Sequence, residues 1–189
     1  MPFNLPIALT WLRIAVIPVF VALFYIPESW VSVPVRDAIA AWIFIAAAIT
    51  DWADGWLARR WKQTSAFGAF LDPVADKLMV AAALLVLLKL GRVDSLIALV
   101  IIGREIAISA LREWMAQMGA SASVAVHWLG KFKTAAQMVA IPCLLYKTSW
   151  HDVPIYVIGQ ILIVIAALLT VWSMFYYLKK AWPTIRDRA

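Results

Sequence analysis

Charged residues are scarce in this sequence. Only 15% of its 189 residues are Asp, Glu, Lys or Arg, whereas 65% are hydrophobic and the mean hydropathy is +0.85. Because roughly a quarter of the residues in a soluble globular domain are charged, this composition excludes that class and indicates an integral membrane protein. Cysteine is limited to Cys143, which excludes an internal disulfide, and we expect it to be a packing residue in an apolar run.

Hydrophobic runs divide the chain into segments of roughly 20 residues, the length needed to cross about 30 Å of hydrocarbon. The first run contains Arg13 and has no small-residue cleavage site before Glu28, so we expect it to be retained rather than removed as a signal peptide. No long connection or convincing repeat separates the runs. We therefore predict one all-α membrane domain over residues 1–189, a bundle of six transmembrane helices over 6–27, 36–60, 70–90, 94–118, 131–148 and 154–181.

Basic residues are distributed unevenly between the connections. The connections after the first, third and fifth segments hold few of the 17 Lys and Arg residues, namely Arg36, Lys89, Arg92 and Lys147. The others lie at the N-terminus, around the second and fourth connections, and in the C-terminal tail. Since cytoplasmic loops carry the excess of positive charge, we predict that both termini are cytoplasmic.

Four aspartates stand at the cytoplasmic ends of the second and third segments, although carboxylates are costly at membrane depth. Asp51 and Asp54 are three residues apart and Asp72 and Asp76 are four apart, so each pair shares one face of its helix. The two faces can converge because the segments are antiparallel neighbours. Two divalent cations would cancel the four negative charges. Oxygen ligands select Mg²⁺, Mn²⁺ or Ca²⁺ over zinc, and paired divalent ions are typical of displacement at phosphorus.

Small residues and an arginine surround these aspartates. Gly55, Ala58 and Gly68 allow a ligand or another backbone to approach closely, and Arg59 offers a planar fork for a phosphate. The alternatives are structural ion pairs with Lys62, Lys77 or Arg104, or an ion path. The facing clusters with helical spacing favour a metal site.

The spacing of these residues carries a family resemblance. The pattern Asp51-x2-Asp54-Gly55-x2-Ala58-Arg59-x8-Gly68-x3-Asp72-x3-Asp76 resembles, without a gap, the signature of the CDP-alcohol phosphatidyltransferase family. The stretches "NLPIALTWLRIAVIP", "GREIAISALREWMAQMG" and "GKFKTAAQM" further resemble bacterial members that use sn-glycerol 3-phosphate.

The resemblance implies an enzyme of phospholipid biosynthesis. It would move the phosphatidyl group of CDP-diacylglycerol to sn-glycerol 3-phosphate, giving phosphatidylglycerophosphate and CMP. It implies a homodimer with two Mg²⁺ (or Mn²⁺) ions, among membrane lipids of the bacterial cytoplasmic (inner) membrane and with no nucleic-acid partner. The metal ligands would be Asp51, Asp54, Asp72 and Asp76, with Asp76 also the general base. Gly55, Ala58, Arg59 and Gly68 would line the CMP end of the donor site.

An anionic acceptor needs cations that the aspartates cannot supply. The candidates toward the cytoplasmic side are Arg104, Arg112, Lys131 and Lys133. Basic residues at this membrane edge are also common topology determinants or lipid-headgroup contacts. Arg104 lies deepest and needs a partner, and Glu105 follows it at about 100° around the helix. Arg13 could reach the donor phosphates or mark the interface.

Other functions share some of these features. A sister enzyme that uses serine, inositol phosphate or phosphatidylglycerol would keep the aspartates, but a neutral acceptor has little use for the basic set. An ion-coupled transporter would place its acids near the midplane between repeated halves, and this sequence shows neither feature.

Overall fold

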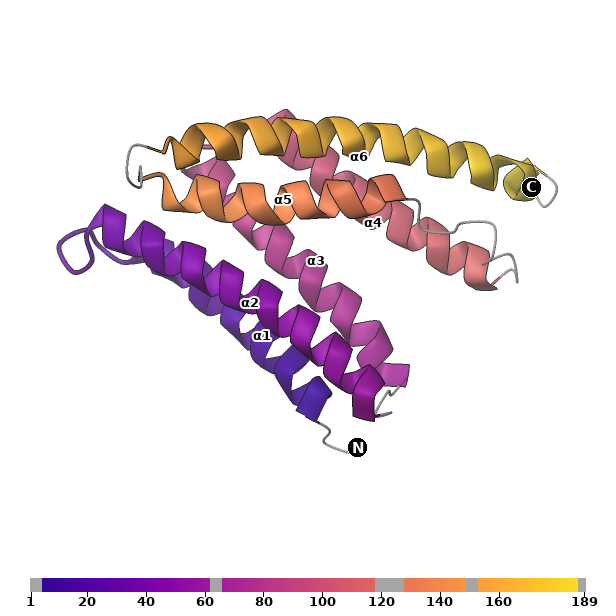
Figure 1. The fold of residues 1–189 in the computed structure, drawn as a ribbon, viewed down its shortest axis with the longest axis horizontal. Coiled ribbons are helices and arrows are strands. Elements are labelled where there is room, and N and C mark those ends of the chain that lie inside the picture. Colours follow the sequence, from indigo (N-terminus) through magenta and orange to yellow (C-terminus); the bar gives the residue numbers. More distant parts are fainter. Residues whose placement is uncertain (1–4, 62–65, 118–127, 149–152, 187–189) are drawn as a thin grey trace.

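The structure, a computed structural model, describes residues 5–61, 66–117, 128–148 and 153–186. Within these ranges some side chains lie outside the described set, among them those of Asp54, Ala58, Arg59 and Lys131. The described residues form six α-helices and a short 3-10 helix, which confirms the predicted all-α class (Figure 1). They are α1 (Leu5–Ala22), η1 (Leu23–Tyr25), α2 (Val33–Trp61), α3 (Ala66–Lys89), α4 (Ser95–Gln117), α5 (Trp128–Tyr146) and α6 (Ile155–Arg186).

Each helix overlaps one of the predicted membrane segments. Three segments among the described residues are long and apolar enough to cross a bilayer, namely Ile7–Tyr25, Val33–Ala53 and Ile155–Lys179. Outward-facing side chains on these and the other helices are large and apolar, for example Trp42, Leu85, Leu99 and Trp172. A surface of this kind suits lipid rather than water. In α3 and α4, charged residues interrupt otherwise apolar sequence.

The helices pack as two side-by-side pairs, which meet where α2 packs against α5. Figure 1 shows α1 beside α2 and α5 beside α6, while α3 crosses between the pairs and α4 packs against α6. The shared core is apolar and includes Phe20, Phe44, Leu84, Ile101 and Leu144. Successive helices run in opposite directions, so the end of α2 meets the beginning of α3. The ends of α4 and α6 and the beginning of α5 lie toward the same side of the bundle, near both termini (Figure 1).

The opposite end of the bundle is held by a buried ionic cluster. Gly91, with φ of 66°, ends α3 in a left-handed turn and directs Arg92 inward. Arg92 Nη2 donates to Asp37 Oδ2 at 2.5 Å, and its Nη1 donates to the carbonyl oxygens of residues 145 and 144 at 2.7 and 3.2 Å. Arg36 lies 3.9 Å from Asp37 Oδ1. This Asp37 clamp therefore joins α2, the end of α3 and the last carbonyls of α5, which have no partner within their own helix.

Candidate active site

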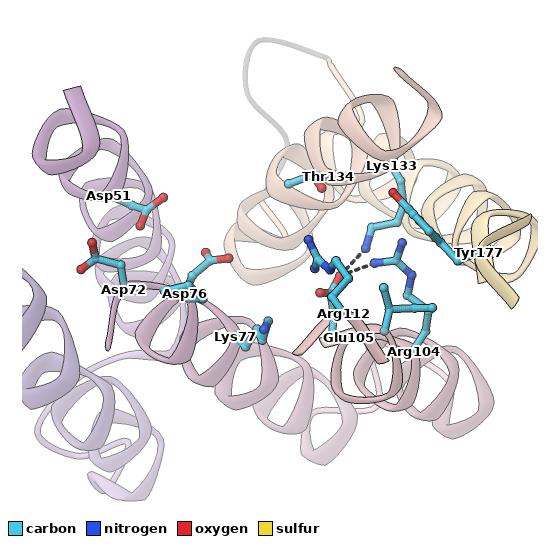
Figure 2. Close-up of a pocket in the computed structure, with 12 residues that line it drawn as sticks. Asp51, Asp72, Asp76, Lys77, Arg104, Glu105, Arg112, Lys133, Thr134 and Tyr177 are labelled. Atoms are coloured by element: carbon cyan, nitrogen blue, oxygen red, sulfur yellow. Dashed lines mark hydrogen bonds and ion pairs between the residues drawn. The ribbon is translucent and has the colours of Figure 1, made fainter. Parts of the chain in front are cut away.

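A pocket of about 380 Å³ opens at the end of the bundle where α2 meets α3 (Figure 2). Side chains from five helices, α2 to α6, form its wall. Its lining residues are Asp51, Asp72, Pro73, Asp76, Lys77, Arg104, Glu105, Ile108, Arg112, Lys133, Thr134 and Tyr177. Carboxylates of α2 and α3 lie on one side in Figure 2, and the basic groups of α4 and α5 lie on the other. Anions and cations can therefore be bound within one cavity.

The acid side of the pocket consists of Asp51 from α2 and Asp72 and Asp76 from α3. Helix α1 also contributes to this side, as one of the two alternatives considered for Arg13 would require. Arg13 Nη1 lies 2.5 Å from Asp51 Oδ1, and the Thr10 hydroxyl donates to Asp72 Oδ1. Arg13 and Thr10 are buried. Both contacts are possible because α1 packs against α2 and α3 together.

The donor chemistry of this side fits a hard divalent cation. Its ligands are carboxylate oxygens, which Mg²⁺ and Mn²⁺ prefer and zinc does not. Among the described side chains, no group of three or more His, Cys, Asp and Glu converges closely enough to hold an ion. Asp54, the fourth acid of the pattern, lies outside the described side chains. Asp51 Oδ1 accepts from Arg13 and Asp72 Oδ1 accepts from Thr10, so donors of α1 orient these two carboxylates.

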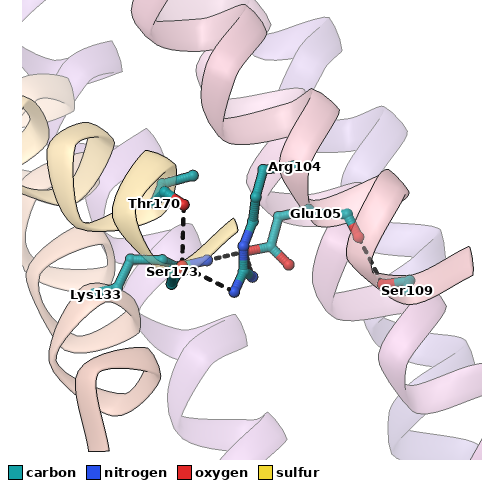
Figure 3. Close-up of polar contacts among 6 residues, drawn as sticks. All are labelled: Arg104, Glu105, Ser109, Lys133, Thr170 and Ser173. Atoms are coloured by element: carbon teal, nitrogen blue, oxygen red, sulfur yellow. Dashed lines mark hydrogen bonds and ion pairs between the residues drawn. The ribbon is translucent and has the colours of Figure 1, made fainter. Parts of the chain in front are cut away.

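Arg104 is one of two buried cations of the basic side, with Lys133. It is only 7% exposed, and its Nη2 donates to the Ser173 hydroxyl at 3.2 Å (Figure 3). Its guanidinium lies 5.7 Å from the centre of the Tyr177 ring. Its Nε is buried and finds no hydrogen-bond acceptor among the described residues. A buried donor without a partner is costly, so an anion that enters the pocket would relieve it.

Lys133 and Arg104 share one counter-ion. Lys133 Nζ donates to Glu105 Oε1, and Arg104 Nη1 lies 3.5 Å from the same oxygen. Lys133 is 1% exposed although it carries a charged ammonium group. Arg104 is therefore paired with Glu105, the next residue in the sequence. The angle of about 100° between successive residues of a helix did not favour this pairing.

The structure describes the side chains of some predicted site residues but not of others. Arg112 and Lys133 line the pocket with Arg104, whereas the side chain of Lys131 lies outside the described set. Gly68 is buried in the first turns of α3, outside the lining. The predicted metal ligand Asp54 and the other donor-site candidates lie in the last turns of α2, where these residues are not described beyond their helical backbone; the donor-site candidates are Gly55, Ala58 and Arg59.

Thr10, Thr134 and Tyr177 were missed in the sequence, and Glu105 was considered there only as a neighbour of Arg104. Thr10 is a hydroxyl in an apolar helix, and Glu105 is an acid within a membrane segment; both are polar residues of the kind that mark function at membrane depth. Tyr177 lies among neighbouring aromatic residues that resemble packing residues, and no spacing distinguishes it.

Comparison with known proteins agrees with this arrangement. The sequence profile of CDP-alcohol phosphatidyltransferases matches residues 3–172. The chain belongs to the CDP-alcohol phosphatidyltransferase family.

Relatives within the family match over their whole length. Three of them bear the name CDP-diacylglycerol–glycerol-3-phosphate 3-phosphatidyltransferase. The protein of Pectobacterium atrosepticum is 52% identical over 183 residues, which cover 96% of either chain. That of Yersinia enterocolitica is 51% identical over 99% of this chain and 100% of its own. That of Shigella flexneri serotype 5b is 48% identical over the full length of both chains.

Proposed function

We propose that this chain transfers the phosphatidyl group of CDP-diacylglycerol to sn-glycerol 3-phosphate, giving phosphatidylglycerophosphate and CMP. The relatives that match it from end to end are named for this reaction. The structural observation that carries the proposal is the single pocket in which the family's aspartates face Arg104, Arg112 and Lys133. A phosphorylated acceptor needs such cations, whereas serine does not.

The acid side would hold two Mg²⁺ or Mn²⁺ ions through Asp51, Asp72 and Asp76, together with Asp54. When bound, the ions polarise the phosphoryl oxygens and stabilise the charge on departing CMP. Gly55, Ala58, Arg59 and Gly68 would line the CMP end of the donor.

Asp76 is the acid-side residue placed best to act as the general base. In Figure 2 it lies between the other two aspartates and the basic groups, with its carboxylate directed toward the basic side. An acceptor whose phosphate is held by those groups would present its hydroxyl near Asp76. The carboxylate can then take the hydroxyl proton as the oxygen attacks phosphorus.

The basic side would hold the acceptor phosphate. Arg104 offers the buried Nε donor, and Arg112, which is exposed at the pocket wall, offers a second guanidinium. Planar guanidinium groups match the geometry of phosphate oxygens. Lys133, and Lys131 two residues earlier, would add positive charge at the beginning of α5, where the helix dipole also favours an anion.

The orientation in the membrane is part of the proposal. Both termini and the pocket would face the cytoplasm, where sn-glycerol 3-phosphate is dissolved, and the chain would act as one membrane domain in a homodimer. The distribution of basic residues supports this orientation. Single cysteines at residues 3 and 188 in a Cys143→Ala background should react with a membrane-impermeant maleimide only in inside-out vesicles. Labelling of intact cells would contradict the orientation.

The reaction can be tested by CMP release from CDP-diacylglycerol by the purified protein. Glycerol 3-phosphate, serine, inositol phosphate and phosphatidylglycerol would each be offered separately with Mg²⁺. We expect release with glycerol 3-phosphate alone, its loss with EDTA or in Asp72→Ala, and its persistence in Glu113→Gln, which removes an exposed acid outside the pocket. Release with a different acceptor would overturn the acceptor assignment, and no release from folded protein with any acceptor would overturn the proposed function.

A further inference from the structure

The proposed reaction needs the cations of the basic side to stay apart from the aspartates, of which Asp51 already pairs with Arg13 of α1. Asp51, Asp72 and Asp76 would need to be available to metal ions, while Arg104 and Lys133 would need to be available to a phosphate. Opposite charges in a cavity of this size attract strongly, because the effective dielectric constant is well below that of water. A long lysine side chain that paired with an aspartate would compete with the metal ions for that carboxylate.

Glu105 stands where it can prevent this pairing. It lines the same pocket as Asp76, but it projects from α4 on the basic side (Figure 2). Its Oε1 accepts from Lys133 Nζ and lies 3.5 Å from Arg104 Nη1. One carboxylate oxygen thus holds the two buried cations of the pocket.

The contact between Glu105 and Lys133 also crosses from one helix to another. Helices α4 and α5 both pack against α6. The ion pair joins them directly, across the region where the pocket lies (Figure 3). Because lysine has a flexible four-carbon stem, the position of its ammonium group depends on the acid that holds it.

We propose that Glu105 is a positioning residue that holds Lys133 and Arg104 on the acceptor side of the pocket and keeps them from pairing with Asp76. The proposal rests on the proposed function, since it concerns the same pocket. Glu105 would act through the cations and would not contact the reacting atoms. Its loss should therefore affect both sides of the pocket, acceptor binding and metal binding.

The decisive variant is Glu105→Gln, which keeps the shape of the side chain and removes its charge. Mn²⁺ binding would be measured by electron paramagnetic resonance without either substrate, and KM for glycerol 3-phosphate would be measured separately. We expect Mn²⁺ affinity to fall on the order of tenfold, because Lys133 is released toward the carboxylates, and KM to rise. Glu105→Asp keeps the charge and should restore much of both. Glu113→Gln, the matched loss of an exposed glutamate from the same helix, should change neither.

The double variant Glu105→Gln/Lys133→Met separates positioning from a merely structural role. It removes the released cation, so Mn²⁺ affinity should return toward that of the wild type while KM stays high. It also keeps the proposal testable if the single variant does not fold, since it leaves no buried lysine without its acid. Failure of the double variant to recover Mn²⁺ affinity would overturn the proposal.

The remaining outcomes distinguish this inference from the proposed function. If the wild type releases CMP and binds Mn²⁺, and Glu105→Gln binds Mn²⁺ equally well, the positioning role is wrong and the proposed function stands. If the wild type shows no metal-dependent CMP release with any acceptor, the proposed function fails, and the inference fails with it.

Discussion

The Asp37 clamp makes a prediction about stability that is independent of the reaction. Asp37 and Arg92 are 2% and 7% exposed, and their side chains are 2.5 Å apart. Arg36 lies on the other side of the same carboxylate, with its guanidinium 5.3 Å from the centre of the Phe24 ring. Asp37→Ala would leave two buried guanidinium groups without their acid.

The magnitude follows from the cost of an unpaired buried charge. Removing one partner of a buried ion pair costs about 3–5 kcal/mol. For a chain of this length each kcal/mol lowers Tm by about 2–4 °C, so Asp37→Ala should melt about 6–20 °C below the wild type. Activity well below the melting temperature should persist, because the clamp and the pocket lie at opposite ends of the bundle.

The assay is thermal unfolding in detergent, followed by the intrinsic fluorescence of the 11 tryptophans. Asp94→Asn is the control, since Asp94 is exposed and accepts a hydrogen bond from the Leu96 N–H at the beginning of α4, which asparagine also accepts. Asp37→Ala/Arg92→Met should recover part of the lost Tm because one orphaned cation is removed. An Asp37→Ala protein that melts within about 2 °C of the wild type would refute the reasoning.

Three further predictions concern the pocket. Thr10→Val removes the donor that orients Asp72 and should lower the apparent Mg²⁺ affinity in CMP release by about tenfold. Thr50→Val should leave this affinity unchanged, because the Thr50 hydroxyl donates to carbonyls of its own helix; equal effects of the two variants would contradict a specific role for Thr10. Tyr177→Leu should raise KM for glycerol 3-phosphate by about fivefold, because it removes about 1 kcal/mol of cation–π attraction to Arg104. Tyr177→Phe keeps the ring, so its KM should stay near that of the wild type; a similar rise of KM in both variants would contradict a role for the ring. Arg104→Lys retains the charge but loses the guanidinium fork, so KM for glycerol 3-phosphate should rise by about tenfold at unchanged kcat. A fall in kcat alone would contradict a role of Arg104 in acceptor binding.

Helical spacing and hydropathy were sufficient to predict the six helices and that Asp51, Asp72 and Asp76 lie at one site, whereas the side chain of Asp54 lies outside the described set. Apolar runs of membrane length and the separations of Asp51 from Asp54 and of Asp72 from Asp76 are properties of single helices, and a sequence states them directly. The sequence predicted only that the aspartates, Arg104 and Lys133 lie toward the same side of the membrane, and not that they line one pocket.

Contacts between helices were harder to predict, because the spacing of residues in the sequence indicates which of them share a helix face but not which other helix packs against that face. The sequence left open whether Arg13 would reach the donor site or mark the interface, and nothing in it indicated that α1 would bring Thr10 to Asp72. The burial of Arg92 was also unexpected, since basic residues near membrane ends usually face water or headgroups. It depends on the left-handed turn at Gly91 and on the carbonyls of a helix more than 50 residues away along the chain.

The lengths of two helices fix the depth of the pocket in the bilayer. Along α6, about 22 residues separate Ile155 from Tyr177, a rise of roughly 33 Å. Along α2, about 18 residues separate Val33 from Asp51, a rise of roughly 27 Å. Both values are close to the roughly 30 Å thickness of the hydrocarbon. If both helices begin at one membrane surface, the pocket lies at the headgroup level of the other leaflet, where a lipid carries its phosphates, so a lipid donor could react without being lifted from the membrane and a soluble acceptor would not need to enter it.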